Sequence, residues 1–224
     1  MAQMKTPGVY IIEKNAFPNS VVEVATAIPA FIGHTQFARD GNKDLTGIPF
    51  RISSMAEFHS FFGFAPTLRF GIRPEDSESE DTTNDINVLF PDGSCQLTLP
   101  KTFYALYYNM LLFYANGGGP CYIVSVGDYE HDFKSIDFTN ALLALKKEQE
   151  PTLVVVPEAV YMEEGDCYKV QTAALMHCGN DMKNRFAILD VFNGYKDENG
   201  AVIKSFRENI GSNFLAYCAS YYPW

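Results

Sequence analysis

Three acidic residues lie at or just beyond the ends of apolar runs that have the composition of buried β-strands. They are Asp128, Glu158 and Asp190. The carboxyl ends of parallel strands share one edge of a sheet, where open α/β sheets gather ligands and metals. Three carboxylates at that edge could bind Mg²⁺, which favours oxygen ligands. This pattern would suit a metal-dependent α/β hydrolase.

The residues around these acids do not strengthen the metal interpretation. No lysine, serine or threonine accompanies them at a recognisable spacing, and acids are also common where strands exit to solvent and cap the next helix. We therefore expect no catalytic, cofactor-binding or metal-binding residues, and hence no cofactor. The metal-dependent hydrolase is kept as the alternative function. A third hypothesis is a small-molecule-binding module with a flavodoxin-like sheet, which predicts a pocket at a strand switch point.

The glycine-rich stretch from Asn116 to Pro120 resembles a phosphate-binding loop only in composition. Phosphate loops run from strand to glycines to helix, so that the helix N-terminus faces the anion. Here a helical pattern precedes the glycines and an apolar strand pattern follows them. This order predicts a glycine C-cap followed by proline.

The four histidines and five cysteines show no spacing typical of a nucleophile or a metal site. His177 falls on an apolar helical face, so we expect a hydrogen-bonded packing histidine. The cysteines are odd in number and lack C-x-x-C spacing, which predicts reduced thiols. Cys121 and Cys218 lie in apolar runs and are expected to be buried in strands.

The acids, glycines, histidines and cysteines discussed above lie within or next to alternating strand and helix patterns, which predict the elements that position them. The strand patterns cover residues 27–33, 121–127, 152–157, 185–192 and 213–224, and the helical patterns cover 53–63, 101–120, 138–150 and 166–182. Continuous apolar strands separated by helices imply right-handed crossovers. The predicted fold class is α/β, a mostly parallel sheet flanked by helices, with an extended N-terminal β-arm and an irregular insertion.

Two local signals add detail to this outline. Ser54 followed by Glu57 is a capping box, and Gly63 is placed to end the helix that begins there. Residues from about 64 to 100 break the regular pattern, and their run RPEDSESEDTTND has almost nothing to bury. We expect an insertion that is rich in solvated, mobile loop.

Composition excludes several classes of protein. The chain has 224 residues, of which 47% are hydrophobic, enough for one domain with a sizeable core. Its formal net charge of −10 repels a phosphate backbone, so direct nucleic-acid binding is not expected. The sequence shows no signal-peptide pattern and no apolar run long enough to cross a bilayer. We expect cytoplasmic synthesis and no membrane insertion.

The first 22 residues have the pattern of an arm and a hinge. A short β-prone run is followed by a polar break before any element could pack. Added to the sheet edge of a neighbouring subunit, such a strand gains about 0.5–1.5 kcal/mol per hydrogen bond. The alternative is a first strand that folds back on its own domain. The predicted arm residues are Val9, Tyr10, Ile11, Ile12 and Glu13, and the hinge residues are Asn15, Pro18, Asn19 and Ser20.

Seven segments occur in the order seen in contractile tail sheath proteins. They are TPGVY, VATAIPAFIG, RISSMAEFHSFFG, FYALYYNMLLFYANGGGPCYIVSVG, EPTLVVVPEAV, RFAILDV and YYPW. The chain thus resembles a sheath subunit of a phage tail or of an extracellular contractile injection system. One departure is Ile11-Ile12-Glu13-Lys14, where similar sheaths often carry two acids.

The resemblance implies a mechanical role without a cofactor. It implies contacts with neighbouring sheath subunits, the inner tube protein, and baseplate and terminator proteins, in a phage tail or a released particle. It makes residues 23–224 the sheath domain. It also implies that a C-terminal sheath region beyond YYPW is absent from these residues, so we expect the 224 residues alone not to form long tubes.

Overall fold

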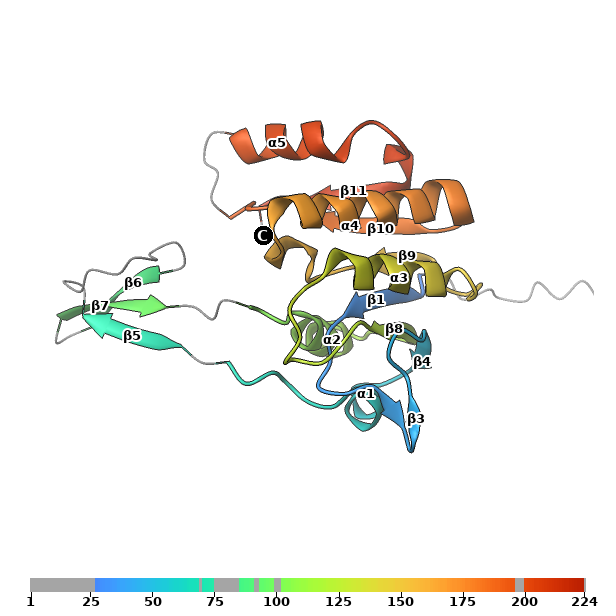
Figure 1. Ribbon diagram of the computed structural model, residues 1–224, viewed down its shortest axis with the longest axis horizontal. Helices are drawn as coiled ribbons and strands as arrows, with labels where there is room; N and C mark the ends of the chain where they lie inside the picture. Colours follow the sequence, from blue (N-terminus) through green and yellow to red (C-terminus); the bar gives the residue numbers. More distant parts are fainter. Residues whose placement is uncertain are drawn as a thin grey trace, which may run out of the picture.

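A six-stranded, mostly parallel β-sheet forms the centre of the computed structural model (Figure 1), which describes residues 27–68, 70–74, 85–90, 93–98, 102–195 and 200–223. The strand order is β11-β10-β9-β1-β8-β4. All neighbouring strands are parallel except β4, which runs antiparallel to β8. The strands are β1 (Pro29–Gly33), β4 (Phe50–Ile52), β8 (Cys121–Ser125), β9 (Leu153–Val155), β10 (Phe186–Asp190) and β11 (Cys218–Tyr221).

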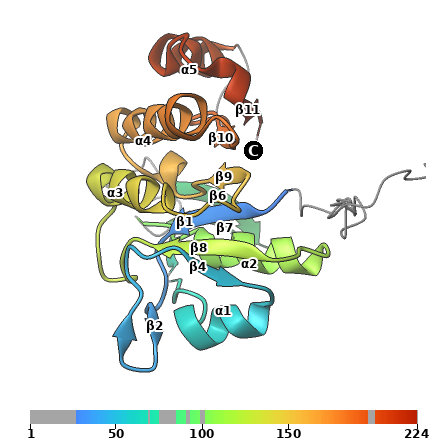
Figure 2. The same ribbon diagram turned by 90° about the vertical axis from the view of Figure 1, so that its right-hand side faces the viewer.

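Five helices flank this sheet, which confirms the predicted α/β class. They are α1 (Met55–Phe62), α2 (Leu106–Ala115), α3 (Ser135–Leu145), α4 (Glu164–Met176) and α5 (Ala201–Ile210). Helices α3, α4 and α5 stack along one face, whereas α1 and α2 lie on the other face over β1, β8 and β4 (Figure 2). The helical pattern at 166–182 continues past α4 as a π-helical segment, His177–Met182.

The alternation of side chains along β1 and β8 builds two separate cores. Ala30 and Ile32 of β1 pack with α3 and α4, while Phe31, between them in sequence, packs with α1 and α2. Successive side chains of a strand point to opposite faces, so a continuous apolar strand can serve both cores. This is why the central strands carry no polar face.

The capping box at the start of α1 is present but is shifted by one residue. The Ser54 hydroxyl accepts a hydrogen bond from the backbone N–H of Glu57 at 3.2 Å. The Glu57 carboxylate accepts from the backbone N–H of Ser53 at 2.6 Å. Gly63 follows α1 with a φ of 85°, as the sequence predicted for a glycine that ends the helix.

The insertion contains a second, antiparallel sheet, which corrects the expectation of an irregular segment. Strands β5 (Gly71–Pro74), β7 (Gly93–Thr98) and β6 (Asp85–Phe90) pair in that order and project away from the main sheet (Figure 1). The acidic composition of this region concealed its strand patterns. Residues 75–84, most of the acidic run, lie outside the described residues. A separate two-residue hairpin joins β2 (Arg39–Asp40) to β3 (Lys43–Asp44).

Helix α5 was not predicted, and the final strand is shorter than predicted. Phe206 and Ile210 of α5 are buried four residues apart, and Gly211 follows the helix with a φ of 75°. This spacing was the available signal, but charged residues between the two apolar positions obscured it. The predicted strand at 213–224 begins instead with a 3₁₀ turn, Leu215–Tyr217, and only four residues form β11. No helix in the described ranges is long and apolar enough to cross a membrane.

Candidate functional site

The predicted arm and hinge lie outside the residues that the structure describes. These are Val9, Tyr10, Ile11, Ile12 and Glu13 in the arm, and Asn15, Pro18, Asn19 and Ser20 in the hinge. The described chain begins at Ala27, whose backbone is left-handed with a φ of 62°. That conformation is uncommon for a residue with a Cβ, and it sets a sharp turn just before β1.

The structure places the three acids near the carboxyl ends of β8, β9 and β10, as predicted, but gives each a different environment. The Asp128 side chain is 41% exposed, Glu158 is fully buried and Asp190 is half-buried. Among the described residues, no group of three His, Cys, Asp or Glu side chains is arranged to hold a metal ion. Asp128, Glu158 and Asp190 therefore do not form the shared metal site that the hydrolase alternative requires.

Glu158 is the buried centre of this edge of the sheet. Its Oε2 accepts hydrogen bonds from the backbone N–H of His34 at 2.9 Å and from the ring Nδ1 of His34 at 2.8 Å. Its Oε1 accepts from the backbone N–H of Leu106 at 3.3 Å. Burial raises the pKa of Glu158, while the hydrogen bonds from His34 act in the opposite direction. Three donors thus compensate for the burial of one carboxyl group.

The contact with Leu106 makes Glu158 an internal cap for helix α2. Leu106 is the first residue of α2, and the N-cap residue Ala105 has no side chain that could accept a hydrogen bond. The first N–H groups of a helix lack intrahelical partners, and the positive end of the helix dipole favours a nearby carboxylate. Glu158 therefore connects the end of β1, through His34, to the start of α2.

His34 fills the space beside Glu158 with its ring. The rings of Tyr104, Phe133 and Phe138 surround it at centroid distances of 5.3, 5.0 and 5.7 Å. Strand β1 lies between β8 and β9, and the gap beyond its carboxyl end is where open α/β sheets bind ligands. The protein's own side chains occupy that position here. The sequence signal was a single polar residue directly after the β1 pattern, and it was missed.

Asp128 belongs to a separate, exposed pair. Its Oδ1 lies 2.6 Å from Nδ1 of His131 and accepts a hydrogen bond from the backbone N–H of Glu130 at 2.9 Å. The Glu130 N–H, and then His131, lower the pKa of Asp128 below its usual value. Asp190 differs again, because burial raises the pKa of its carboxyl group. Opposite shifts on the two acids reflect their unlike surroundings.

Gly33 is required for the close approach of β1 to this site. A Cβ added at residue 33 would lie 2.9 Å from Cβ of Leu106 and 3.1 Å from Cδ of Glu158. We expect Gly33→Ala to lower the free energy of unfolding by about 1–3 kcal/mol, because a packed core must shift to admit the methyl group. Urea denaturation followed by circular dichroism measures the change.

Gly165→Ala is the matched control, since nothing lies within 4 Å of a Cβ added there in α4. This change should leave stability unaltered or raise it by up to about 1 kcal/mol, because alanine is the better helix former. Equal effects of the two substitutions would contradict the close approach at Gly33.

An aromatic cluster lies at the base of the insertion and was not predicted. We define it as His59, Phe64, Tyr104, Tyr107 and Tyr129. The ring of Phe64 stacks on His59 at 4.6 Å, and the Phe64 carbonyl accepts a hydrogen bond from the Tyr129 hydroxyl at 2.9 Å. On the returning side of the insertion, the Tyr104 hydroxyl donates to the carbonyl of His131 at 3.0 Å. Both ends of the insertion are thereby attached to the loop that follows β8.

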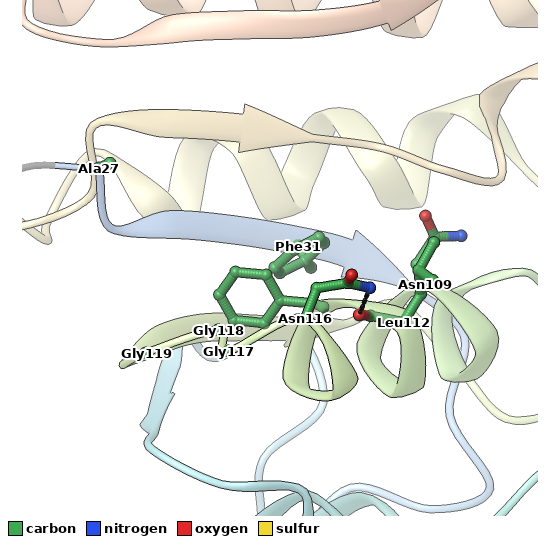
Figure 3. A pocket seen from close by; sticks show the side chains of 9 residues that line it. Ala27, Phe31, Asn109, Leu112, Asn116, Gly117, Gly118 and Gly119 are labelled. Atoms are coloured by element: carbon green, nitrogen blue, oxygen red, sulfur yellow. Dashed lines mark hydrogen bonds between the residues drawn. The ribbon is translucent and has the colours of Figure 1, made fainter.

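The glycine-rich stretch ends α2, as predicted, and borders a hollow of about 520 Å³. Gly117 has a φ of 83°, and the backbone N–H of Gly118 donates to the carbonyl of Phe113 at 2.9 Å. Figure 3 shows the glycines beside Phe31, with the Asn116 side chain bonded to the carbonyl of Leu112. The described residues that line it include no cationic side chain that could pair with a phosphate.

His177 is a buried packing histidine, as predicted. It is 2% exposed, and Nη1 of Arg185 donates to its Nε2 at 2.8 Å. All five cysteines are free thiols, and Cys121 is buried, whereas Cys218 is only half-buried. The expectation of reduced cysteines is consistent with this arrangement, and the expected burial of Cys218 is corrected. Within the described ranges, none of these groups forms a nucleophile with an adjacent base.

Neither a protein-family model nor a curated protein matches this sequence. The resemblance to contractile sheaths therefore has no support from these comparisons. It enters below as a proposal.

Proposed function

We propose that this chain is a structural subunit of a contractile sheath, which polymerises around an inner tube and contracts to drive that tube through a target envelope. The observation that carries the proposal is the occurrence of seven sheath-like segments in sheath order along the chain. Each segment alone is a weak signal, but a fixed order of seven is far more specific. The proposal includes the partners that the resemblance implies: neighbouring subunits, tube, baseplate and terminator.

The hydrogen bonds that connect separate elements of the described structure are compatible with a mechanical role. Glu158 joins β1 to α2, and the aromatic cluster attaches both ends of the insertion to the loop after β8. A subunit that transmits force needs elements that keep their relative positions while interfaces rearrange. The position at which a ligand would bind in this fold is filled by His34 and Glu158.

The mechanism we propose needs no cofactor, and no hydrolysis reaction drives the contraction of the sheath. Subunits assemble in an extended, metastable lattice and then switch together to a better-packed contracted lattice. A difference of about a few kcal/mol per subunit becomes large when many subunits switch cooperatively. The arm, Val9 to Glu13, would keep neighbours connected during this motion, and Asn15 to Ser20 would be the hinge.

The test is deletion of residues 1–15 from the sheath protein that carries this sequence, expressed together with its tube and baseplate proteins. We expect negative-stain microscopy to show no sheathed tubes, because each arm supplies the hydrogen bonds that connect one subunit to the next. The protein itself should stay folded, with an unchanged circular dichroism spectrum.

The matched control replaces Val9 with isoleucine and Ile11 with valine, which keeps an apolar, β-branched strand. Sheathed tubes should form in normal numbers with this variant. If the deletion variant formed normal sheathed tubes, the arm would not be required for sheath assembly. Absence of any tube with the unaltered protein would contradict the sheath function itself.

A further inference from the structure

The outer strands of the sheet carry apolar side chains that belong to neither core. We call Leu153, Val155, Phe186, Ile188 and Ala219 the outer apolar face. The parallel register aligns Val155, Ile188 and Ala219 in one row across β9, β10 and β11, and aligns Leu153 with Phe186 in the next. All five side chains are half-buried, and only Val155 packs against one of the two cores.

The helices leave this face uncovered. On β10 the alternate residues Ala187 and Leu189 are buried under α4 and α5, so Phe186 and Ile188 point to the opposite side. On that side the described helices α1 and α2 cover β1, β8 and β4, and neither extends over β10 and β11 (Figure 2). Among the described residues, helices thus cover the half of the sheet formed by β9, β10 and β11 on one side only.

The outer apolar face is continuous with the hollow beside α2. Phe31 lines the hollow and pairs in register with Val155 of the face. Leu112 of α2, at the rim of the hollow, is 64% exposed. Ala27 lies at another part of the same rim (Figure 3). The described chain therefore begins at the border of this apolar surface.

We propose that the segment Val21 to Ala25 of the same chain covers the hollow and the adjoining outer apolar face. In an extended chain Val22 and Val24 would share one side, and Glu23 would point away from it. Residue 24 lies at most about 10 Å from Ala27 at the maximum rise of an extended chain. Neighbouring strands are spaced by about 4.8 Å, so β9 and β10 are within reach.

Connectivity favours this occupant over a second copy of the chain. A segment attached to the rim is present at a high effective concentration, and it loses no translational freedom when it docks. The more distant apolar run at Val9 to Ile12 is separated from the rim by the polar residues Asn15 to Ser20. The inference does not depend on the sheath proposal.

The first experiment compares two double variants of the full 224-residue chain. In one, Val22→Asp and Val24→Asp place charges in the docked segment; in the other, Val9→Asp and Ile11→Asp place the same charges in the arm. We expect the first to lower Tm by about 4 °C or more and to increase the fluorescence of the apolar dye ANS, because apolar surface becomes exposed. The second should change neither.

A photo-crosslinker distinguishes the possible occupants directly. With p-benzoylphenylalanine at position 22, irradiation should produce cross-links to β9, β10 or the hollow within a monomeric chain, identified by mass spectrometry. A cross-linked dimer would assign the surface to a second copy and overturn the proposal. Cross-links elsewhere in the chain, or equal effects of the two double variants, would also overturn it.

Discussion

Replacing Glu158 with alanine is expected to lower the free energy of unfolding by about 3–5 kcal/mol, the usual cost of removing one partner from a buried, hydrogen-bonded pair. Glu158 is fully buried and accepts hydrogen bonds from the backbone N–H and the ring Nδ1 of His34 and from the N–H of Leu106. Without the carboxyl group these donors are left in an apolar site with no acceptor. Urea denaturation followed by circular dichroism gives the change.

Asp128→Ala is the matched control, because Asp128 also lies at the carboxyl edge of the sheet. Its side chain is 41% exposed and pairs with an exposed His131, so water can replace the lost contact. The control should change stability by at most about 1 kcal/mol. Similar losses for the two alanine variants would show that Glu158 does not act as the internal cap of α2.

The second large effect is expected from Arg185→Met, which should lower the free energy of unfolding by about 2–4 kcal/mol, since a buried group that loses its partner costs about 1–3 kcal/mol. Arg185 is 2% exposed, and its guanidinium donates to the carbonyls of Leu145 and Glu148 at the end of α3. It also donates to His177. Methionine fills similar space but has no N–H donor for any of the three acceptors.

The same variant has a second readout in the pH dependence of stability. Burial, and then the nearby Arg185 charge, lower the pKa of His177 from 6.5 to about 4. Between these values the unfolded chain binds more protons than the folded chain, so stability falls as the pH is lowered from 6.5 towards 4. Removing the Arg185 charge should raise the folded-state pKa of His177 and make this fall smaller.

Lys147→Met is the matched control for Arg185, because it removes a charge of the same sign from an exposed position near the same end of α3. It should change stability by no more than about 0.5 kcal/mol. It should also leave the fall in stability below pH 6.5 unaltered. If the Arg185→Met protein were as stable as this control, other groups must donate hydrogen bonds to the carbonyls at the end of α3.

The elements with continuous apolar strands were the most predictable from sequence. The patterns at 27–33, 121–127, 152–157 and 185–192 all contain strands of the central sheet, because a strand buried on both sides leaves little choice of residue. The antiparallel sheet of the insertion and helix α5 were missed. Both lie where polar residues dilute the apolar pattern, so local periodicity carries little signal there.

The candidate site also has features that were predictable from sequence and features that were not. That acids would follow three strands was evident from residue order, and so was the capping role of the glycines after α2. Residue order could not show that Glu158 would be buried against His34 while Asp128 would be exposed. Those environments depend on which helices and loops meet at the end of each strand.

The α/β class and the mostly parallel sheet could be predicted from residue order alone, because hydrophobic periodicity and segment length are local properties of the chain. The contact of Glu158 with His34 and Leu106 became evident only from the fold, since these residues are separated by up to 124 positions along the chain. The fold also showed that no helix in the described part of the chain covers one face of β9, β10 and β11. Burial and pairing depend on contacts between distant segments, and local patterns do not encode those contacts.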